Sequence, residues 1–264
     1  MDKNTILYRW TEKNGGVFSQ FEIDVIAHRI YFINLFLKNK RNIKLLDVGA
    51  GSGIMSSFLE IDSDKYFCLE LVSENIDNLK KMGVKNIVQA DCLNIPFKPK
   101  SFEFVMAMAM IYYVNFVDFI KEVSTVISDS GTLVFCTSNP QALSFEPAIG
   151  TNRYYSISEL NTLLLQYGFK AEFYGFFEDI FIQRKYNYLH QLKTLLKFFK
   201  FHLFFSIIWN KLRIKFYGGK VFLDNKTLIN SLNFSSYVKG EELNVSSYNK
   251  IYKVIYCVAI FKGR

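Results

Sequence analysis

The sequence is poor in the residues that are typical of disulfide-rich and zinc-binding proteins. Its 264 residues include only four cysteines, three histidines and four prolines. The cysteines lie far apart and form no C-x-x-C pair: Cys68, Cys92, Cys136 and Cys257. This spacing excludes a disulfide framework and a zinc pattern, and it favours reduced thiols inside a cytoplasmic protein. We therefore expect no metal site.

Long uncharged apolar runs are also missing. None approaches the ~18 residues that a membrane-spanning helix needs. The opening MDKNTILYRW lacks the basic-then-apolar pattern of a secretory signal. The chain is nevertheless 50% hydrophobic and 17% aromatic, so a large core is available. We expect a cytoplasmic protein that does not cross a bilayer.

Acidic residues are absent from one long segment. Residues 180–223 contain nine Lys or Arg and no Asp or Glu, which leaves 23 basic and 24 acidic residues elsewhere. The whole net charge of +8 therefore comes from this segment. Drift in composition explains the abundance of lysine better than it explains the absence of acids.

Up to about residue 180 the sequence alternates strand-like and helix-like stretches. Apolar runs of strand length are IKLLDVG, YFCLELV, KNIVQA, FEFVMAMA and GTLVFCTS. Helix-like stretches are FEIDVIAHRIYFINLFL, SENIDNLKKMG, VDFIKEVSTVISDSG and SISELNTLLLQYGF. The last opens with a capping-box pattern, Ser156 and Glu159, and ends at Gly168. KAEFYGFF and YKVIYCVAIF supply two more strands. This order predicts an α/β fold with a doubly wound sheet covered on both faces.

A glycine-rich turn follows the first of these strands. LLDVGAGSG places Gly49, Gly51 and Gly53 where the backbone can turn tightly and a ligand can approach the main chain. A dinucleotide fingerprint would need its third glycine at position 54, which is Ile54. The turn is therefore not of the dinucleotide type.

Two acids follow at the ends of the next strands. Glu70 ends the second strand about 20 residues past the glycines, where a carboxylate can accept both ribose hydroxyls. Asp91 follows the third strand in VQADCLNIPF. A lone glycine turn or a lone acid at a strand end is often structural. All three features in this order and at this spacing are hard to attribute to chance together.

These motifs resemble those of the class I S-adenosylmethionine-dependent methyltransferases, over residues 25–180 and again at the last strand. The resemblance implies a Rossmann-like sheet of seven strands, the last antiparallel, with an N-terminal helical cap and a C-terminal insertion. It also implies S-adenosylmethionine as the cofactor. The cofactor-binding residues implied are Asp47, Gly49, Gly51, Gly53, Glu70, Leu71, Asp91, Cys92 and Met108. Arg29 on the preceding helix is a candidate for the methionine carboxylate, or else a solvated arginine.

The acceptor is less defined by the sequence. The fourth strand runs into AMAMIYYV, without the N/D/S-P-P-aromatic motif of amino-methylating nucleic-acid enzymes or the Pro-Cys pair of cytosine-C5 enzymes. TSNPQ follows the fifth strand, so we interpret it as a loop. Tyr113 stands where many small-molecule members of the family have a histidine, and it is the candidate catalytic residue. Candidate acceptor-lining residues are Tyr112, Tyr113, Tyr154 and His190; the tyrosines could equally be ordinary half-buried ones. We expect His28 and His202 to be structural.

The acid-free segment contains the stretch LKTLLKFFKFHLFFSIIW. As a helix it would place Leu192, Leu196 and Phe199 on one face, with a narrow stripe of lysines beside it. Such a helix is too apolar for solvent. Residues 192–215 are therefore predicted to form a buried lid, a foot on an anionic membrane, or an arm for RNA.

The sequence thus predicts a methyltransferase core at 1–183, an insertion at 184–250 and a last core strand at 251–264. The favoured function is methyl transfer from S-adenosylmethionine to a small or lipid-linked acceptor, such as a sugar hydroxyl in surface glycan synthesis. Peripheral contact with the inner membrane face through 192–215 would suit such an acceptor. The alternatives are an RNA methyltransferase and a non-catalytic module that binds S-adenosylmethionine.

Overall fold

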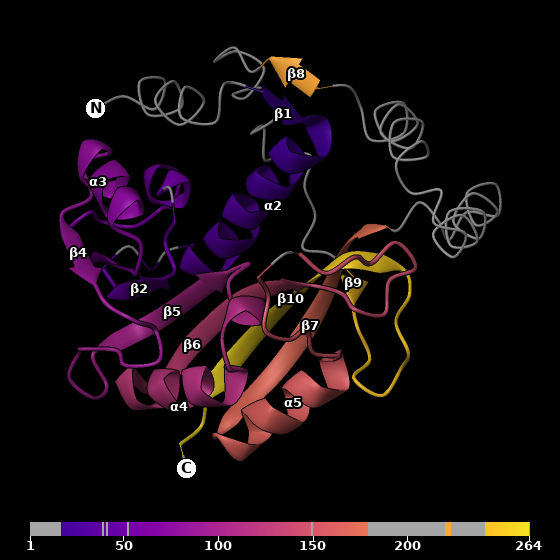
Figure 1. Ribbon diagram of the computed structural model, residues 1–264. Coiled ribbons are helices and arrows are strands. Elements are labelled where there is room, and N and C mark those ends of the chain that lie inside the picture. The colour runs from indigo at the N-terminus through magenta and orange to yellow at the C-terminus, as the bar shows by residue number, and fades with distance from the viewer. Residues whose placement is uncertain are drawn as a thin grey trace.

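The computed structural model describes residues 17–38, 40, 42–51, 53–148, 150–178, 220–222 and 241–263. Their main feature is a mixed sheet of eight strands in the order β4-β3-β2-β5-β6-β10-β7-β9 (Figure 1). The strands are β2 (Leu45–Val48), β3 (Tyr66–Glu70), β4 (Asn86–Gln89), β5 (Phe102–Met108), β6 (Ile127–Ser138), β7 (Phe169–Glu178), β9 (Glu241–Glu242) and β10 (Tyr252–Phe261). A separate antiparallel pair joins β1 (Val17–Ser19) to β8 (Lys220–Phe222) beside the start of α2 (Gln20–Leu37).

The pairing follows from continuous apolar strands. β3 and β5 flank β2 in parallel, β4 continues beyond β3, and β6 continues beyond β5. All four residues of β2 are buried, as a strand covered on both faces requires. β10 lies antiparallel between β6 and β7. The prediction of a doubly wound, seven-stranded sheet with an antiparallel last strand is confirmed, and the two-residue β9 extends it at one edge.

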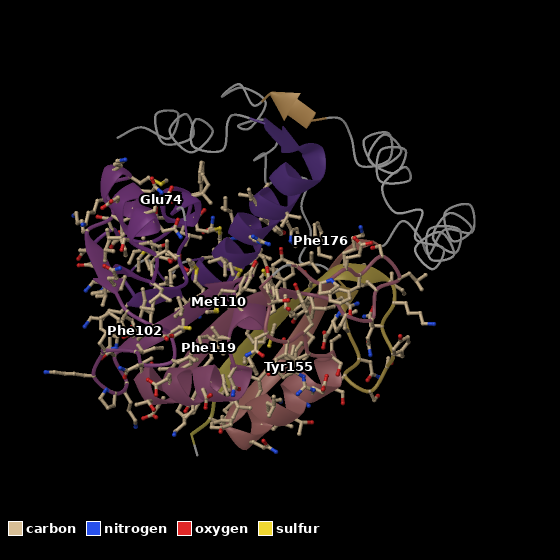
Figure 2. All side chains as sticks on the ribbon, in the orientation of Figure 1. Glu74, Phe102, Met110, Phe119, Tyr155 and Phe176 are labelled. Carbon is tan, nitrogen blue, oxygen red and sulfur yellow. The ribbon has the colours of Figure 1, made fainter. Side chains whose placement is uncertain are left out.

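Helices cover the sheet on two faces. On one face α2 and α3 (Ser73–Lys81) pack against the sheet, and Ile30 and Phe32 of α2 are fully buried there. On the other face lie α4 (Phe116–Val126) and α5 (Ile157–Gln166), where Phe119 and Tyr155 belong to a second apolar cluster (Figure 2). The short 3-10 turns η1 (Ile54–Ser57) and η2 (Ile111–Tyr113) follow β2 and β5. None of the helices in these described ranges is long and apolar enough to span a membrane.

Helix α4 is shorter than its sequence predicts. The helical pattern extends over 117–131, but the helix ends at Val126 and the chain continues directly into β6. Val126 and Ile127 are β-branched, and Ile127 pairs with Phe102 of β5 across a register shift. Ser130 then adopts a left-handed φ of 61° ahead of the main run of β6. Tertiary pairing therefore ends the helix before its local pattern does.

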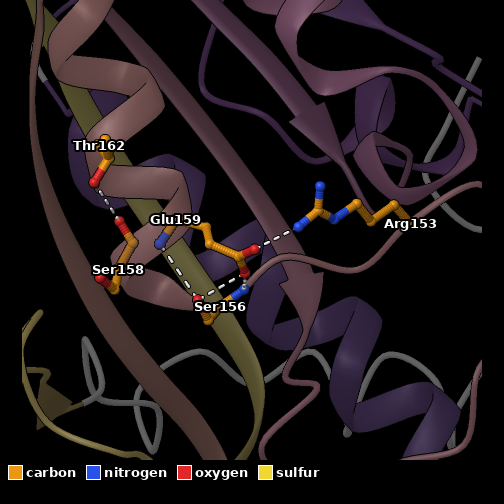
Figure 3. A network of polar contacts seen from close by, with 5 residues as sticks. All are labelled: Arg153, Ser156, Ser158, Glu159 and Thr162. Atoms are coloured by element: carbon orange, nitrogen blue, oxygen red, sulfur yellow. Dashed lines mark hydrogen bonds and ion pairs between the residues drawn. The ribbon is translucent and has the colours of Figure 1, made fainter.

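The start of α5 confirms the predicted capping box (Figure 3). Ser156 Oγ accepts a hydrogen bond from the backbone N–H of Glu159, and Glu159 Oε2 accepts one from the N–H of Ser156 at 2.8 Å. Arg153 adds an ion pair to the other oxygen of Glu159 at 2.5 Å. Two otherwise unpaired N–H groups are thereby satisfied, which fixes the loop that enters the helix. This loop carries Tyr154 and Tyr155.

The predicted division at 183/184 and 250/251 stays a prediction. β9 falls within the predicted insertion and pairs with the core strand β7, and β8 in the same insertion pairs with β1 near the N-terminus. The insertion is thus joined to the core at two separate points by backbone hydrogen bonds.

Candidate functional site

The glycine turn after β2 lies at the carboxyl edge of the sheet. Gly49, Gly51 and Gly53 all have left-handed φ values, of 70°, 57° and 77°. The N–H of Gly49 donates to the carbonyl of Leu69 at 2.8 Å, which joins the turn to β3. A side chain at any of the three would be strained in this conformation.

The three glycines differ in what surrounds them. A Cβ on Gly49 would lie 3.2 Å from Met110 Cγ, and one on Gly53 would lie 2.6 Å from Leu79 Cδ2. A Cβ on Gly51 would meet nothing nearer than the carbonyl oxygen of Gly49 at 3.9 Å. Packing therefore explains the small residues at 49 and 53, whereas a Cβ at 51 would meet a single backbone atom at ordinary contact distance. A ligand can approach the backbone there.

Glu70 joins this turn to the end of β3. Its Oε2 accepts a hydrogen bond from the N–H of Gly51 at 2.8 Å. Its Oε1 accepts from the N–H groups of Leu71 and Val72 at 3.0 and 2.9 Å. The residue is only 5% exposed, so this buried carboxylate is stabilised by three backbone donors. Carboxylate oxygens have about four lone-pair sites, and acceptor capacity is left for a ligand hydroxyl.

Asp47 lies beneath the turn and is bound to Tyr66. The Tyr66 hydroxyl donates to Asp47 Oδ2 at 2.5 Å, and Asp47 is 2% exposed. Burial raises the pKa of Asp47 to about 7; the hydrogen bond from Tyr66 opposes this rise and the charge of Glu70 adds to it. Asp47 therefore changes charge near neutral pH, unlike a carboxyl group in water.

The surface beside Glu70 is apolar. Leu71 and Val72 are 60% and 51% exposed, although both directly follow a buried strand. Asp91 is exposed, and its Oδ1 accepts a hydrogen bond from the N–H of Leu93 at 2.9 Å. Burial and the adjacent Asp91 carboxylate raise the pKa of the Cys92 thiol to about 12, so the thiol is protonated and unreactive at neutral pH. An apolar patch next to two acids suits a nucleoside with its ribose hydroxyls.

Met110, two residues after the predicted Met108, lies against the glycine turn at Gly49. Met108 ends β5 and packs against the α2-side core, while the side chain of Met110 lies over Gly49. Between them Ala109 has a left-handed φ of 57°, uncommon for a residue with a side chain. This kink turns Met110 over the turn. In the sequence, AMAM shows two methionines close together at the end of the strand. It does not show that Ala109 turns the backbone between them.

A row of aromatic rings follows β5 and β6. Tyr112 contacts Tyr113, stacks on Tyr154 with ring centroids 4.9 Å apart, and Phe145 meets Tyr154 edge-on. The carbonyl of Tyr112 accepts a hydrogen bond from the N–H of Asn152 at 2.8 Å, which joins the two loops. Tyr113 is 50% exposed at the end of the row. The structure thus brings together the three predicted tyrosines.

Arg29 of α2 lies beside these loops and is mostly buried. The Cys136 thiol and the hydroxyls of Tyr256 and Tyr112 are the titratable groups that act on the pKa of its guanidinium. Burial opposes the charge, but these neighbours together raise the pKa of Arg29 above its ordinary value, so the group is cationic. Its Nε is buried without a hydrogen-bond partner, and no ion pair with an acid of the described ranges involves it. A cation so placed can receive an anionic ligand group.

The predicted cofactor fits these residues. The backbone at Gly51, the carboxylate of Glu70, the exposed side chain of Leu71 and the cation of Arg29, which pairs with no acid of the described residues, are groups of the kinds that the methionine chain, ribose, adenine and carboxylate of S-adenosylmethionine would need. Asp91 lies on the same edge of the sheet.

Three predictions concern histidines or the aromatic segment. His28 is fully buried, as expected of a structural residue, and its Nδ1 lies 3.0 Å from the Tyr256 hydroxyl. His190, His202 and residues 192–215 lie outside the described residues. Across the part of the chain that is described, no group of three or more His, Cys, Asp or Glu could hold a metal ion.

Comparison with known sequences identifies the central part of this sheet. Residues 46–135 match the family described as "Methyltransferase domain". The chain is 29% identical to a ubiquinone biosynthesis O-methyltransferase of Pelagibacter ubique over 157 residues, 54% of this chain and 65% of that relative. It is 27% identical to an uncharacterized protein of Methanocaldococcus jannaschii over 124 residues, 47% of this chain and 53% of that relative. The matches thus span less than two thirds of either relative.

Solved structures share the fold. A SAM-dependent methyltransferase of Archaeoglobus fulgidus has a TM-score of 0.52 at 12% identity, covering 86% of this chain and 92% of that one. A Thermotoga maritima protein, described as a SAM-dependent methyltransferase and possible histamine N-methyltransferase, has a TM-score of 0.50 at 14% identity, covering 99% and 100%. At such identities the likeness concerns the arrangement of the sheet and helices.

The raised pKa of Asp47 predicts how stability depends on pH. Between pH 4 and 7, roughly, the folded protein keeps a proton that Asp47 releases on unfolding, because the folded pKa of about 7 exceeds the ordinary 3.8. This contribution to stability is complete below the unfolded pKa and is lost as pH rises to the folded one. The loss is on the order of 4 kcal/mol. We expect Asp47→Asn, which stays neutral and can accept from Tyr66, to lack this loss.

Chemical unfolding of the cofactor-free protein at a series of pH values measures the effect. The difference in free energy of unfolding between Asp47→Asn and the unchanged protein should grow steadily with pH over this interval. Asp62→Asn, a substitution of an exposed acid, controls for the removal of one charge. Parallel curves for Asp47→Asn and the unchanged protein would contradict the prediction.

Proposed function

Because the chain carries a class I S-adenosylmethionine-dependent methyltransferase domain, we propose that it transfers a methyl group from S-adenosylmethionine to a hydroxyl of a small or lipid-linked acceptor. A sugar hydroxyl in surface glycan synthesis is the preferred acceptor. The domain's cofactor is S-adenosylmethionine; the activity of the whole protein and its acceptor are proposals.

One observation carries the proposal: the buried Glu70 carboxylate accepts a hydrogen bond from the N–H of Gly51 and so joins the glycine turn to the end of β3, at the carboxyl edge of the sheet. Ligands of open α/β sheets bind at this edge. We assign the ribose to Glu70 and the adenine to Asp91, Cys92 and Leu71. The methionine end is assigned to the turn from Asp47 to Gly53, with Met108 and Met110 beside it and Arg29 at its carboxylate.

Methyl transfer to a hydroxyl needs alignment and removal of a proton. When bound, the cofactor would supply a methyl group on a cationic sulfur, which could pass to the acceptor oxygen with the sulfur as leaving group. The hydroxyl proton must leave to a base or to water during this step. Of the three histidines, His28 is the one within the described residues. It is buried and its ring contacts Tyr256, so it does not face an acceptor as a base would. Tyr113, half exposed at the end of the aromatic row, is our candidate for orienting the hydroxyl.

The aromatic row supports an acceptor with an apolar face and hydroxyl groups. Pockets for such ligands combine aromatic walls with few polar groups, and Tyr112, Tyr113 and Tyr154 offer both. The Pelagibacter relative is named an O-methyltransferase, which supports oxygen as the methylated atom. A phenol, like a sugar, has an apolar face and a hydroxyl group. The methyl-labelling experiment below distinguishes the two acceptors.

Cofactor binding tests the site directly. Glu70→Gln keeps the shape of the side chain but removes its charge, and Asp91→Ala removes the second acid. We expect each to weaken S-adenosylmethionine binding about tenfold or more in calorimetry, since each loses a charged hydrogen-bond acceptor. Asp129→Asn, an exposed acid paired with Lys100, is the control and should bind normally. If both site variants bind like the unchanged protein, the assignment is wrong.

The acceptor can be traced with S-adenosylmethionine labelled on its methyl group. The full chain is incubated with a lysate of its source cells lacking this protein, which is then separated into lipid, glycan, RNA, protein and small-molecule fractions. We expect label in the lipid or glycan fraction, on a sugar oxygen. Label on a phenol would replace the sugar, and label in RNA would favour an RNA methyltransferase. Binding without any transfer would indicate a non-catalytic module.

The same assay tests Tyr113. Tyr113→Phe keeps the ring and loses the hydroxyl, so we expect at least a tenfold slower transfer with unchanged cofactor affinity. Tyr248→Phe, an exposed tyrosine outside the aromatic row, should transfer normally. Equal rates for Tyr113→Phe and the unchanged protein would remove Tyr113 from the site.

A lipid-linked acceptor would be reached at a membrane surface, and we propose that residues 192–215 make this contact. The segment has no acid and interleaves lysines with large apolar residues. Each basic residue near an anionic leaflet contributes roughly 1 kcal/mol, so several together give reversible attachment.

Vesicle sedimentation tests the membrane contact. The full chain should co-sediment with vesicles containing anionic phospholipid at low salt, and much less with neutral vesicles or at high salt. Replacing Lys193, Lys197 and Lys200 together by Gln should reduce the bound fraction. Absence of co-sedimentation at low salt would leave the segment as a lid.

A further inference from the structure

Three amide side chains join two loops at the carboxyl edge of the sheet, away from the residues assigned to the cofactor. Asn139 directly follows β6 and is 1% exposed, and Asn249 lies just before β10 and is 8% exposed. Gln141 is the third member of this amide cluster and is half-buried. Buried amides cost stability unless they are hydrogen-bonded. Their presence here therefore needs a reason beyond the packing of apolar residues.

Both polar atoms of the Asn139 side chain are hydrogen-bonded. Its Nδ2 donates to the backbone carbonyls of Asn249 and Tyr252 at 3.0 and 2.7 Å. Its Oδ1 accepts from the N–H of Gln141 at 3.0 Å. Its own backbone N–H donates to the carbonyl of Lys253 at 2.8 Å. One side chain thus binds the end of β6 to carbonyls that lie 110 and 113 residues further along the chain.

The loop before β10 is bound in the opposite direction as well. The backbone N–H of Asn249 donates to Gln141 Oε1 at 2.8 Å. The side-chain Oδ1 of Asn249 accepts from the N–H of Ile251 at 3.1 Å, which shapes the entry into β10. A buried polar network whose groups are satisfied holds one arrangement of the chain. The amide cluster therefore fixes the position of each loop relative to the other.

A series of direct contacts leads from Asn139 to the aromatic row. The N–H of Ala142 donates to the carbonyl of Asn139 at 3.2 Å, and the N–H of Phe145 donates to the carbonyl of Ala142 at 3.0 Å. The Phe145 ring meets Tyr154 edge-on with centroids 4.8 Å apart, and Tyr154 stacks on Tyr112. The place where the loop starts therefore affects where Tyr154 lies against Tyr112.

The other end of this loop is held by the start of α5. Glu159 accepts from the N–H of Ser156 and pairs with Arg153 (Figure 3). The described part of the loop, residues 139–148 and 150–155, is thus attached at both ends. The amide cluster supplies the attachment at the end that follows β6.

We propose that Asn139 and Gln141 are positioning residues, which hold the loop between β6 and α5 so that the aromatic row binds the acceptor. This inference rests on the proposed function, because it takes the aromatic row to line the acceptor site. The two amides act through Phe145 and Tyr154. Hydrogen bonds are directional, so they fix a loop more exactly than apolar contacts do, and methyl transfer depends on such alignment.

The first test is Asn139→Asp, which keeps the shape and Oδ1 of the side chain but loses its two donated hydrogen bonds. The probe is the lysate fraction that accepts labelled methyl from the unchanged protein, added at increasing concentration. We expect the KM for this fraction to rise about tenfold and kcat to change less than about threefold, because the row binds the acceptor without taking part in the bond changes. Calorimetry should show unchanged affinity for S-adenosylmethionine.

Asn244→Asp is the matched control. It makes the same chemical change at an exposed residue of the loop before β10, where Oδ1 accepts from the N–H of Ser246 and would still do so. Its KM should equal that of the unchanged protein.

A milder pair of substitutions at Gln141 repeats the test. Gln141→Met loses the acceptor for the N–H of Asn249, and Gln141→Glu keeps it. We expect Gln141→Met to raise the KM roughly threefold or more, as the loss of one hydrogen bond allows, and Gln141→Glu to stay near the unchanged protein.

Amide hydrogen exchange measures the position of the loop without any acceptor. The N–H groups of Asn152 and Arg153 both donate to the carbonyl of Tyr112, at 2.8 and 3.3 Å. In Asn139→Asp they should exchange about tenfold faster, while the N–H groups between β5 and β6 keep their protection.

The results that would overturn the inference are specific. If Asn139→Asp lowers only the maximum rate and leaves the KM unchanged, less of the protein is folded and the amide cluster serves stability alone. Equal KM values for Gln141→Met and Gln141→Glu, or unaltered exchange at Asn152 and Arg153, would also show the inference to be wrong. Failure of the proposed function looks different: the unchanged protein would then transfer no label to any fraction, and the positioning role would fall with it.

Discussion

The hydrogen bonds of the Glu70 carboxylate hold together the edge of the sheet on which the site depends. One oxygen binds the N–H of Gly51 and the other binds the first two N–H groups after β3. The glycine turn after β2 and the end of β3 therefore form one unit, although they are 19 residues apart at the Gly51 contact. Because these bonds to a charged acceptor are buried, they are stronger than ordinary ones. They also leave Leu71 and Val72 facing outward.

The two faces of the sheet differ in composition: one is packed with apolar residues, and the other also contains buried ionisable groups. The cluster under α4 and α5 is built from apolar residues such as Phe119, Phe135 and Leu160, and it holds the strands in register. The α2 face carries the buried polar groups His28, Asp47 and Glu70. Buried ionisable groups cost stability unless they are paired, so the position of these three on one face points to a requirement other than packing. The Asp47–Tyr66 and His28–Tyr256 contacts show how that cost is offset.

Local sequence patterns predict some features of this structure correctly and miss others. The capping box at Ser156, the glycine turn and the strand-end position of Glu70 each depend on residues within a few positions, and each is as predicted. Helix α4 ends five residues before its predicted end at Gly131, because pairing of Ile127 with Phe102 competes with the helix. Met110 covers Gly49 only because Ala109 adopts a left-handed φ, which no sequence rule for alanine indicates.

The sequence by itself determined the order of strands and helices and the doubly wound sheet, because hydrophobic periodicity and glycine spacing act locally along the chain. The kind of cofactor came from the resemblance of its motifs to those of a known family. Only the tertiary structure decided which groups meet at the site. His28 and Tyr256 are 228 residues apart, and Arg29, Cys136 and Tyr112 come from three separate elements. Such contacts arise when α2 packs on the sheet and β10 inserts beside β6, and the burial that results sets the charge state of Asp47. Burial and long-range pairing belong to the folded chain as a whole, so no short stretch of sequence contains them.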